Sequence, residues 1–283
     1  MENRRTPFRI DPAPDPVDPE LEPLLNEPFV SAWAAVPSAP KSPSGRLRQR
    51  LLDRLAASKA ASATMTTSRW RHLDSAPVAA GVSIRTLYAA PSDRTLRPGE
   101  PLRACLIELQ PGARWSGPGE EHHREWLVLQ GSARVGDTTM ERHDYRLAPA
   151  GQAAETVASE SGARLFLRES ALPAFVAGTA FTVHDAETDW PDYAPGIRRR
   201  VLWQHEGQAA LLYHAEPGAS VPMHSHGHDE ECLMVQGELF LDDILLQAGD
   251  YQLAPAGTGH CITETDTGVI IYAHGDLDLK FSG

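Results

Sequence analysis

Three histidines and one glutamate stand at a spacing that could bind a metal ion. His224, His226 and Glu230 belong to one segment of the form G-x5-H-x-H-x3-E-x6-G. His260 ends a second segment, G-x5-P-x-G-x2-H, which starts twelve residues after the first one ends. Imidazole and carboxylate ligands suit borderline divalent ions, so the pattern predicts a site for one ion of zinc, iron, manganese or nickel. Four protein ligands can close a tetrahedral zinc site or leave open positions on an octahedral ion, and both remain possible.

These four side chains must be brought together by strands and tight turns. His224 and His226 are two residues apart, so they project from the same face of an extended segment. Glu230 is expected to begin the following strand. His260 must arrive on another strand, after a turn that is shaped by Pro255 and a neighbouring glycine.

Other polar residues lie close to this pattern and need separate assignments. We expect His228 to be a loop residue or to support a ligand, because the corresponding position of an internal repeat, described below, is also histidine. Glu231 should point away from Glu230 and be structural. Cys232 could line a metal cavity or be an ordinary buried residue, and the second alternative is favoured. Cys261 should face away from His260.

Composition excludes several classes of function. The 283 residues carry 26 basic and 38 acidic side chains, a net charge of −12, which repels phosphate backbones and argues against nucleic-acid binding. Three widely spaced cysteines do not form a disulfide framework and suit a reducing cytoplasm. No apolar stretch is long and unbroken enough to span a bilayer, and no signal peptide is visible. We therefore expect a cytoplasmic protein that does not bind membranes.

The pattern along the chain predicts an all-β protein with an N-terminal extension. Residues 1–42 are rich in proline and should form a largely irregular, extended arm. Leucines at helical spacing predict an amphipathic helix over residues 43–63. From there on, short apolar or alternating runs are separated by Gly, Pro and Asp clusters every 8 to 12 residues. This texture is typical of an antiparallel sandwich or barrel.

The chain contains an internal duplication. Residues 111–158 align with residues 217–264 at an offset of 106, with 16 of 48 positions identical and no gap. Further upstream the offset is 115, so the first copy has a longer loop. A period near 110 residues indicates duplicated domains, because solenoid repeats are much shorter. We place the copies at 64–170 and 178–283.

The first copy lacks the metal ligands. Pro118, Glu120, Arg124 and Ala154 stand where the second copy has its three histidines and its glutamate. Proline and alanine offer no ligand atom on their side chains, and arginine is a cation. A shifted register of the acidic residues and histidines at 120–125 could form a weak site. We expect instead that this copy packs against the other, binds a small organic ligand or binds nothing.

The two motifs resemble the paired signature motifs of the cupin superfamily. That resemblance covers both copies and implies a double-stranded β-helix, or jelly-roll barrel, for each. It also implies that His224, His226, Glu230 and His260 are the metal ligands. The second motif usually ends in asparagine, whereas this chain has Glu264 three residues after His260.

A narrower resemblance is to the ChrR-like cupins. It rests on the arginine- and leucine-rich run at 46–56, the stretch 70–81 and the motifs at 217–230 and 249–260. In ChrR the cupin follows a zinc-binding domain that holds a sigma factor through an H-x3-C-x2-C ligand set. Residues 1–45 of this chain contain neither histidine nor cysteine, which puts sigma-factor binding in doubt.

Two functions are the main candidates, and a storage or scaffold cupin is a third alternative. The first is a regulatory or sensing module, acting in transcription regulation, that binds a divalent ion and a small-molecule signal. The alternative, which other cupins suggest, is a mononuclear non-haem dioxygenase acting on a small diketone or hydroxyketone. In an enzyme, Tyr251 and His274 are the candidate bases. Because jelly-roll barrels often pair their edge strands, we expect a homodimer.

Overall fold

The protein is described from a computed structural model over residues 64–172 and 178–281, together with Gln49 and Leu52. Gln49 and Leu52 are both helical, as the helix predicted at 43–63 requires, but the rest of that helix and the arm at 1–42 lie outside the described residues. No helix in the described part is long and apolar enough to cross a membrane. Both halves of the β structure belong to one unit, Ala56–Gly283.

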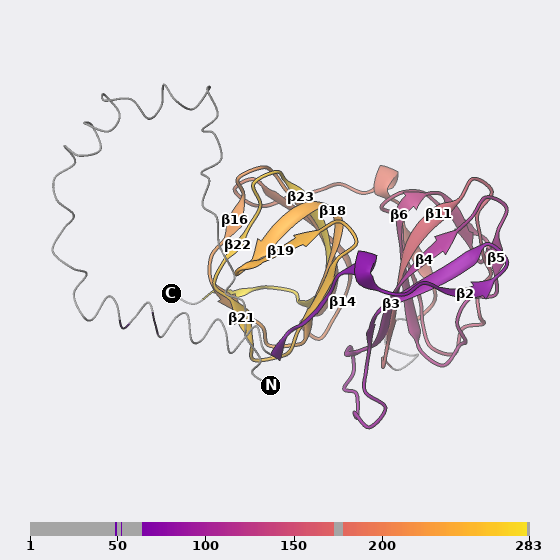
Figure 1. Ribbon diagram of the computed structural model, residues 1–283, viewed down its shortest axis with the longest axis horizontal. Helices are drawn as coiled ribbons and strands as arrows, with labels where there is room; N and C mark the ends of the chain where they lie inside the picture. Colours follow the sequence, from indigo (N-terminus) through magenta and orange to yellow (C-terminus); the bar gives the residue numbers. More distant parts are fainter. Residues whose placement is uncertain (1–48, 50–51, 53–63, 173–177, 282–283) are drawn as a thin grey trace, which may run out of the picture. The chain divides into compact units, whose positions relative to one another are not determined.

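The first half is built from two antiparallel sheets. One has seven strands in the order β12-β9-β6-β11-β4-β3-β2, and the other has four in the order β5-β10-β7-β8 (Figure 1). Buried side chains such as Trp126, Val135 and Met140 form its core. The strands are β2 (Ala76–Ala79), β3 (Val82–Ala89), β4 (Pro101–Leu109), β5 (Arg114–Trp115), β6 (His123–Gly131), β7 (Ala133–Val135), β8 (Thr138–Met140), β9 (Tyr145–Ala148), β10 (Val157–Ala158), β11 (Ala163–Ser170) and β12 (Phe181–Val183).

The second half repeats this jelly-roll design. Its main sheet has the order β1-β20-β18-β23-β15-β14-β13, to which β16, β19 and β22 add, and β21-β17-β24 form a small sheet beside it. A separate apolar core, with Leu211, Met234 and Leu246, fills it. The strands are β1 (Thr66–Ser68), β13 (Asp192–Ala194), β14 (Ile197–His205), β15 (Gln208–Ala215), β16 (Ser220–Val221), β17 (His224–Ser225), β18 (Glu230–Leu241), β19 (Ile244–Gln247), β20 (Tyr251–Ala254), β21 (Gly259–His260), β22 (Thr263–Glu264), β23 (Val269–Asp276) and β24 (Lys280–Phe281).

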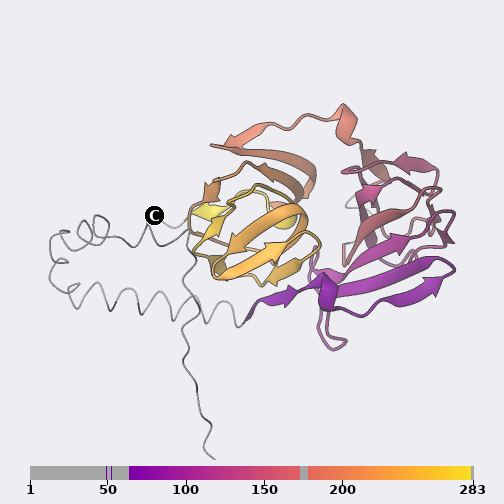
Figure 2. The same cartoon turned by 45° about the horizontal axis from the view of Figure 1, so that its top comes forward.

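The two halves exchange one strand each. Strand β1 lies at the start of the first copy in the sequence, yet it pairs with β20 of the second half (Figure 2). Strand β12 precedes the second half and pairs with β9 of the first. The residue after each exchanged strand then binds an equivalent aspartate: Arg69 contacts Asp250 at 2.6 Å, and His184 contacts Asp144 at 2.8 Å. The exchange is reciprocal, so each jelly roll contains one strand from the sequence of the other copy.

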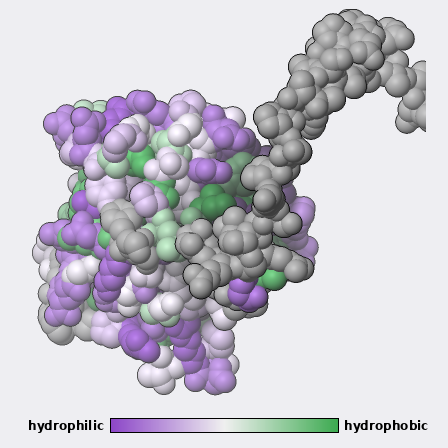
Figure 3. Space-filling model, turned by 90° about the vertical axis from the view of Figure 1, so that its left-hand side faces the viewer, coloured by the Kyte–Doolittle hydropathy of each residue, from purple (hydrophilic) through white to green (hydrophobic). Residues whose placement is uncertain are grey.

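A third apolar core joins the halves. It contains buried residues of both copies, including Leu127 and Phe166 from the first and Leu233 and Leu253 from the second. The outer surface is different: large exposed hydrophobic side chains in the described part of the chain are limited to Leu52, Val78, Val201 and Ile262. In the space-filling view hydrophobic residues are scattered among hydrophilic ones (Figure 3).

A buried charge cluster lies within this joint core. Arg168 of β11 is fully buried and contacts carboxylates of both halves, Glu125 at 2.7 Å and Glu231 at 2.5 Å. Hydroxyl groups complete the cluster, because Tyr145 donates to Glu125 and Tyr251 donates to Glu231, both at 2.7 Å. The carboxylates thus face one guanidinium and a set of hydroxyl donors, and the cluster ties strand β18 to the first half.

Loss of the Arg168 guanidinium should destabilise the whole protein. In Arg168→Met two carboxylates stay buried without their cation, so the free energy of unfolding should fall by about 3–5 kcal/mol. Urea unfolding followed by tryptophan fluorescence measures this. Arg97→Met is the matched control, because the Arg97 side chain is 81% exposed and its removal should cost less than about 0.5 kcal/mol. Equal losses in the two variants would contradict a structural role for the cluster.

Candidate metal centre

Backbone pairing brings the two sequence motifs together. Strands β17 and β21 are antiparallel, and their register sets His224 directly opposite His260. Two further hydrogen bonds join the segments beyond these strands, from the His226 amide to the Thr258 carbonyl at 2.9 Å and from the Gly257 amide to the His226 carbonyl at 2.8 Å. The turn that the sequence predicts before His260 is therefore bonded directly to the His-x-His segment.

Three of the four predicted ligands form one close group, and His260 lies beside it. Potential ligand atoms of His224, His226 and Glu230 all lie within 4.8 Å of one another. His260 Nε2 lies 3.9 Å from the Glu230 carboxylate, and its ring centroid is 5.1 Å from that of His226 and 5.7 Å from that of His224. All three histidines are buried. The structure thus groups His224, His226 and Glu230 and sets His260 next to them, and the role of all four as ligands stays a prediction.

Each imidazole is held through its Nδ1 atom. The His224 Nδ1 contacts the Pro222 carbonyl at 3.0 Å, and the His260 Nδ1 contacts the Asp242 carboxylate at 3.3 Å. The Thr258 hydroxyl donates to the Pro255 carbonyl, so it is free to accept from the His226 Nδ1 at 3.5 Å. An acceptor at Nδ1 fixes the proton there and leaves a lone pair on Nε2, as in metal-binding histidines.

Two of the three Nε2 atoms have no hydrogen-bond partner among the described residues. Nε2 of His226 and Nε2 of His260 are buried without one. His226 Nε2 does lie 2.8 Å from the Glu230 carboxylate, which is a close charge contact. Buried polar atoms that lack partners are rare in folded proteins. Buried imidazole nitrogens grouped beside a carboxylate form a donor set that fits a divalent cation.

The electrostatics keep the carboxylate ionised. Burial raises the pKa of Glu230, but the charges of His226, His260 and His224 outweigh it and lower that pKa to about 2. The pKa of His224 is lowered, chiefly by burial, which favours its neutral form. Burial also lowers the pKa of His226, but the Glu230 carboxylate outweighs it and raises that pKa, which favours the charged form. A cation bound at His226 would therefore compete with a proton.

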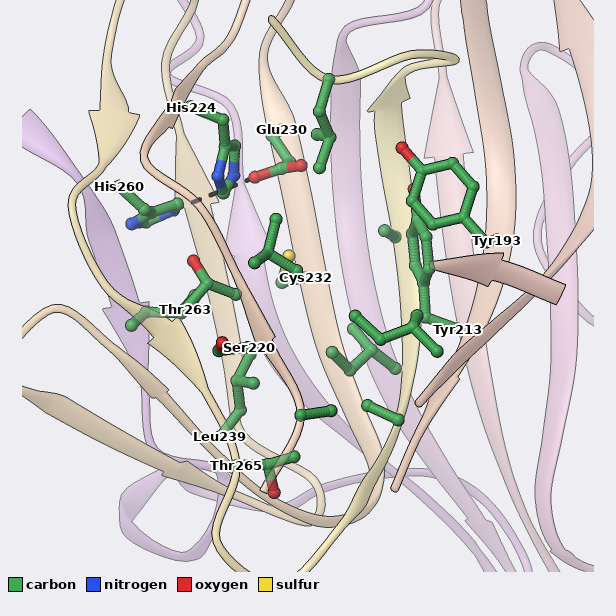
Figure 4. A pocket seen from close by; sticks show the side chains of 18 residues that line it. Tyr193, Tyr213, Ser220, His224, Glu230, Cys232, Leu239, His260, Thr263 and Thr265 are labelled. Carbon is green, nitrogen blue, oxygen red and sulfur yellow. Dashed lines mark ion pairs between the residues drawn. The ribbon is translucent and has the colours of Figure 1, made fainter. Parts of the chain in front are cut away.

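A mostly apolar cavity opens beside these residues. His224, Glu230 and His260 lie together at one end of it, and Tyr193 and Tyr213 line the opposite wall (Figure 4). The volume of this cavity is about 70 Å³. A cavity needs about 10–15 Å³ to hold one water, so this space holds several waters or a small organic molecule.

The two residues that the sequence suggests as catalytic bases lie outside the site. Tyr251 and His274, the two candidate bases, do not line the cavity, and this expectation was wrong. The register pairs His274 with Glu231 rather than with Glu230, so strand alternation turns it toward the joint core. Burial and Arg168 lower the pKa of His274 to about 3, so it is neutral there.

Other neighbours follow their predictions. Glu231 is buried on Arg168, away from the metal residues, and Cys261 is exposed. The His228 Nδ1 contacts Asp276 at 2.5 Å, which makes it a loop residue outside the ligand set. Cys232 lines the cavity, but it is also buried against the apolar core of the second half, so it shows both features that the sequence left open.

In the first half an arginine occupies the position equivalent to Glu230. Arg124 is fully buried, and its guanidinium donates to three backbone carbonyls, those of Gly119, Gln152 and Ala153. Among the described residues the geometry assembles metal-binding groups only around His224, so the weak site considered at 120–125 is not formed. The Arg124 guanidinium is thus bonded to the loops that correspond to the predicted metal site of the second half.

Sequence reasoning missed the residues that orient the histidines. Asp242 lies in the turn between β18 and β19, where its backbone has a positive φ of 53°. One of its oxygens accepts from the amides of Cys261 and Ile262, and the other faces His260. An aspartate in a tight turn is too common to be noticed, and only the folded arrangement connects it with His260.

The metal content of a double variant tests the ligand assignment. His224→Ala together with His226→Ala removes half of the donor set, so the purified protein should lose nearly all bound metal by elemental analysis. His122→Ala, at the first-copy position equivalent to His228, is the control and should keep a full equivalent. Retention of one metal per chain by the double variant would refute the assignment.

Asp242 should tune metal affinity without being a ligand. In Asp242→Asn the acceptor opposite His260 becomes an amide, which can no longer fix the proton on Nδ1. We expect metal affinity to fall by about 10- to 100-fold, as for other residues that support a ligand. Competition with a fluorescent chelator measures this. Unchanged affinity at normal stability would show that Asp242 only holds the turn.

The comparisons with known proteins agree with this fold. Residues 179–278 match the family of the ChrR cupin-like domain. No curated protein matches the sequence. Among solved structures, a proposed dioxygenase from Nostoc punctiforme has a TM-score of 0.57 and 16% identity, with 78% of this chain and 84% of that one covered. Bacillus subtilis oxalate decarboxylase has a TM-score of 0.55 and 16% identity, with coverage of 77% and 78%.

A third structure, oxalate decarboxylase from Lactobacillus farciminis, has a TM-score of 0.57 and 14% identity, with 76% of this chain and 87% of that one covered. At such identities the likeness concerns the fold alone. The sequence match covers the half that holds the four predicted ligands. The chain therefore has a cupin fold, and its second half matches the ChrR cupin-like domain.

Proposed function

We propose that the second half holds one divalent metal ion through His224, His226, Glu230 and His260, and that a small molecule meets this ion in the adjacent cavity. The observation that carries the proposal is the position of the cavity, which is lined by three of these four residues. A metal that only stabilised the fold would not need such an opening. When bound, the ion would polarise substrate oxygens and, if it is iron, supply redox chemistry.

The cavity contains few groups that could do chemistry without a metal. Burial raises the pKa of the Cys232 thiol and of the Tyr213 hydroxyl, so both stay protonated at neutral pH. Neither is then a nucleophile or a base. Apart from the predicted ligands, the remaining polar groups are the hydroxyls of Tyr193, Ser220, Thr263 and Thr265. This lining favours a reaction in which the substrate binds the metal directly, such as dioxygenation of a small diketone or hydroxyketone.

A second candidate is a sensing role. The match of residues 179–278 to the ChrR cupin-like domain favours it. In this case the metal and the cavity would bind a small signal molecule without turnover, and the protein would act through a partner in transcription regulation. Both functions use the same four residues and the same cavity, so they differ in whether bound substrate is consumed.

Oxygen uptake by metal-loaded protein separates the two functions. Protein loaded with ferrous iron should consume oxygen with 2,4-pentanedione or 3-hydroxybutan-2-one, because the metal would join the substrate oxygens to a redox centre. Protein loaded with zinc, and the His224→Ala/His226→Ala variant treated with iron, are the controls and should consume none. Tight zinc binding, with no oxygen uptake by the iron-loaded protein, would reject the dioxygenase in favour of the sensor.

A further inference from the structure

The charges around the cavity argue against an anionic occupant. Apart from Glu230, the histidines and the Cys232 thiol, the described lining is aliphatic, aromatic or hydroxyl-bearing, and none of these described residues is an arginine or lysine. The nearby Arg199 lies behind the wall, with its guanidinium 4.1 Å from the Tyr193 ring centroid. It donates to the Leu277 carbonyl at 2.7 Å and to the Asp278 carboxylate at 3.4 Å, and it also interacts with the Tyr213 hydroxyl of the wall. A buried carboxylate in this lining would lack a partner cation beyond the metal itself.

One hydroxyl in the lining has no partner. Thr263 Oγ1 is buried and makes no hydrogen bond. Thr265 differs, because its hydroxyl donates to the Glu238 carbonyl at 2.6 Å and accepts from the Gly268 amide at 3.0 Å. Ser220, on the strand that pairs with β22, is exposed. Thr263 is therefore the threonine of this cavity whose hydroxyl is available to a ligand.

The position of Thr263 is fixed by the sheet. Its strand β22 pairs on one side with β16, where Thr263 lies opposite Val221, and on the other with β18, where it lies opposite Leu241. In Figure 4 Thr263 lies next to His260, at the end of the cavity that holds the predicted ligands. A molecule that reached the metal would thus come close to a rigidly held, unsatisfied hydroxyl.

We propose that the cavity selects a small uncharged molecule with an apolar body and an oxygen that hydrogen-bonds to Thr263. The inference deepens the proposed function and depends on it, because the metal would bind the same molecule. The apolar wall would cover the carbon skeleton, while the Thr263 hydroxyl would distinguish molecules that carry a second oxygen. Dicarboxylates of the same size are excluded, since their outer oxygens would be buried against aliphatic side chains.

A pair of isosteric probes tests the selection by charge. 2,4-Pentanedione and malonate differ only in that two methyl groups replace two carboxylate oxygens. We expect the zinc-loaded protein, which cannot turn over substrate, to bind 2,4-pentanedione at least about tenfold more tightly in calorimetric titration. Elemental analysis after each titration checks that neither probe has removed the metal. Equal or tighter binding of malonate, or no binding of 2,4-pentanedione, would overturn the selection.

Three variants test the role of Thr263. Thr263→Val keeps the shape but removes the hydroxyl, so the Kd for 2,4-pentanedione should rise by roughly 2- to 10-fold while the metal content stays full. Thr263→Ser should restore most of the affinity. Thr267→Val, the same change at an exposed threonine outside the cavity lining, should leave the Kd unchanged. An unchanged Kd in Thr263→Val would refute the assignment of Thr263.

The outcomes also separate this inference from the proposed function. If the wild-type protein binds no metal, the proposed function fails and the inference fails with it. If metal binds but the probes are not distinguished, only the inference fails. If the probes are distinguished and the iron-loaded protein takes up no oxygen, the selective cavity stands and belongs to a sensor.

Discussion

Two adjacent glutamates at the start of strand β18 need two cations on opposite sides of the strand. Successive side chains of a strand point to opposite faces, so Glu230 turns into the second half and Glu231 turns into the joint core. Each is buried, and a buried carboxylate is stable only when it is paired. Arg168 of the first half supplies the cation for Glu231. The histidines, and the ion that we propose they bind, do so for Glu230.

The first half meets the same constraint in a different way. Glu125 is the equivalent of Glu231 and contacts the same Arg168 guanidinium at 2.7 Å. Its neighbour Arg124 stands at the position equivalent to Glu230. The Arg124 guanidinium donates hydrogen bonds to backbone carbonyls of the surrounding loops. The first half thus has a positive charge where the second half has Glu230, and the local fold is kept. The duplicated structure survives in both halves, and the metal residues survive in one.

The joint core is symmetric in its framework and asymmetric in its charges. Tyr145 and Tyr251 are equivalent and bind equivalent glutamates. Arg168, however, corresponds to His274, which is neutral because burial and Arg168 lower its pKa. A second guanidinium at this position would face the first one in a buried environment. The cluster therefore has one cation, Arg168, for two carboxylates. Tyrosine hydroxyls supply the further hydrogen bonds to both carboxylates.

The sequence predicts the local chemistry better than the arrangement of the two halves. The spacing of His224, His226, Glu230 and His260 suffices to place them together, because strand periodicity and one tight turn determine their directions. Asp242 and Thr258 could not be identified, since their contacts with His260 and His226 arise only when separate turns meet. The offset of 115 residues also relates β1 to β12, but the repeat does not show that each strand pairs with the other half.

The reciprocal strand exchange explains why a half without metal ligands is still needed for the metal centre. Strand β20 pairs with β18 on one side and with β1 on the other, so it would be an edge strand if β1 were absent. The register of β20 sets Ala254 opposite Glu230, and the turn that carries His260 begins directly after it. Strand β1 and Arg168 therefore brace the two segments that supply Glu230 and His260. Because both come from the sequence of the first half or from the segment before it, the first half can lose its ligands without losing its structural role.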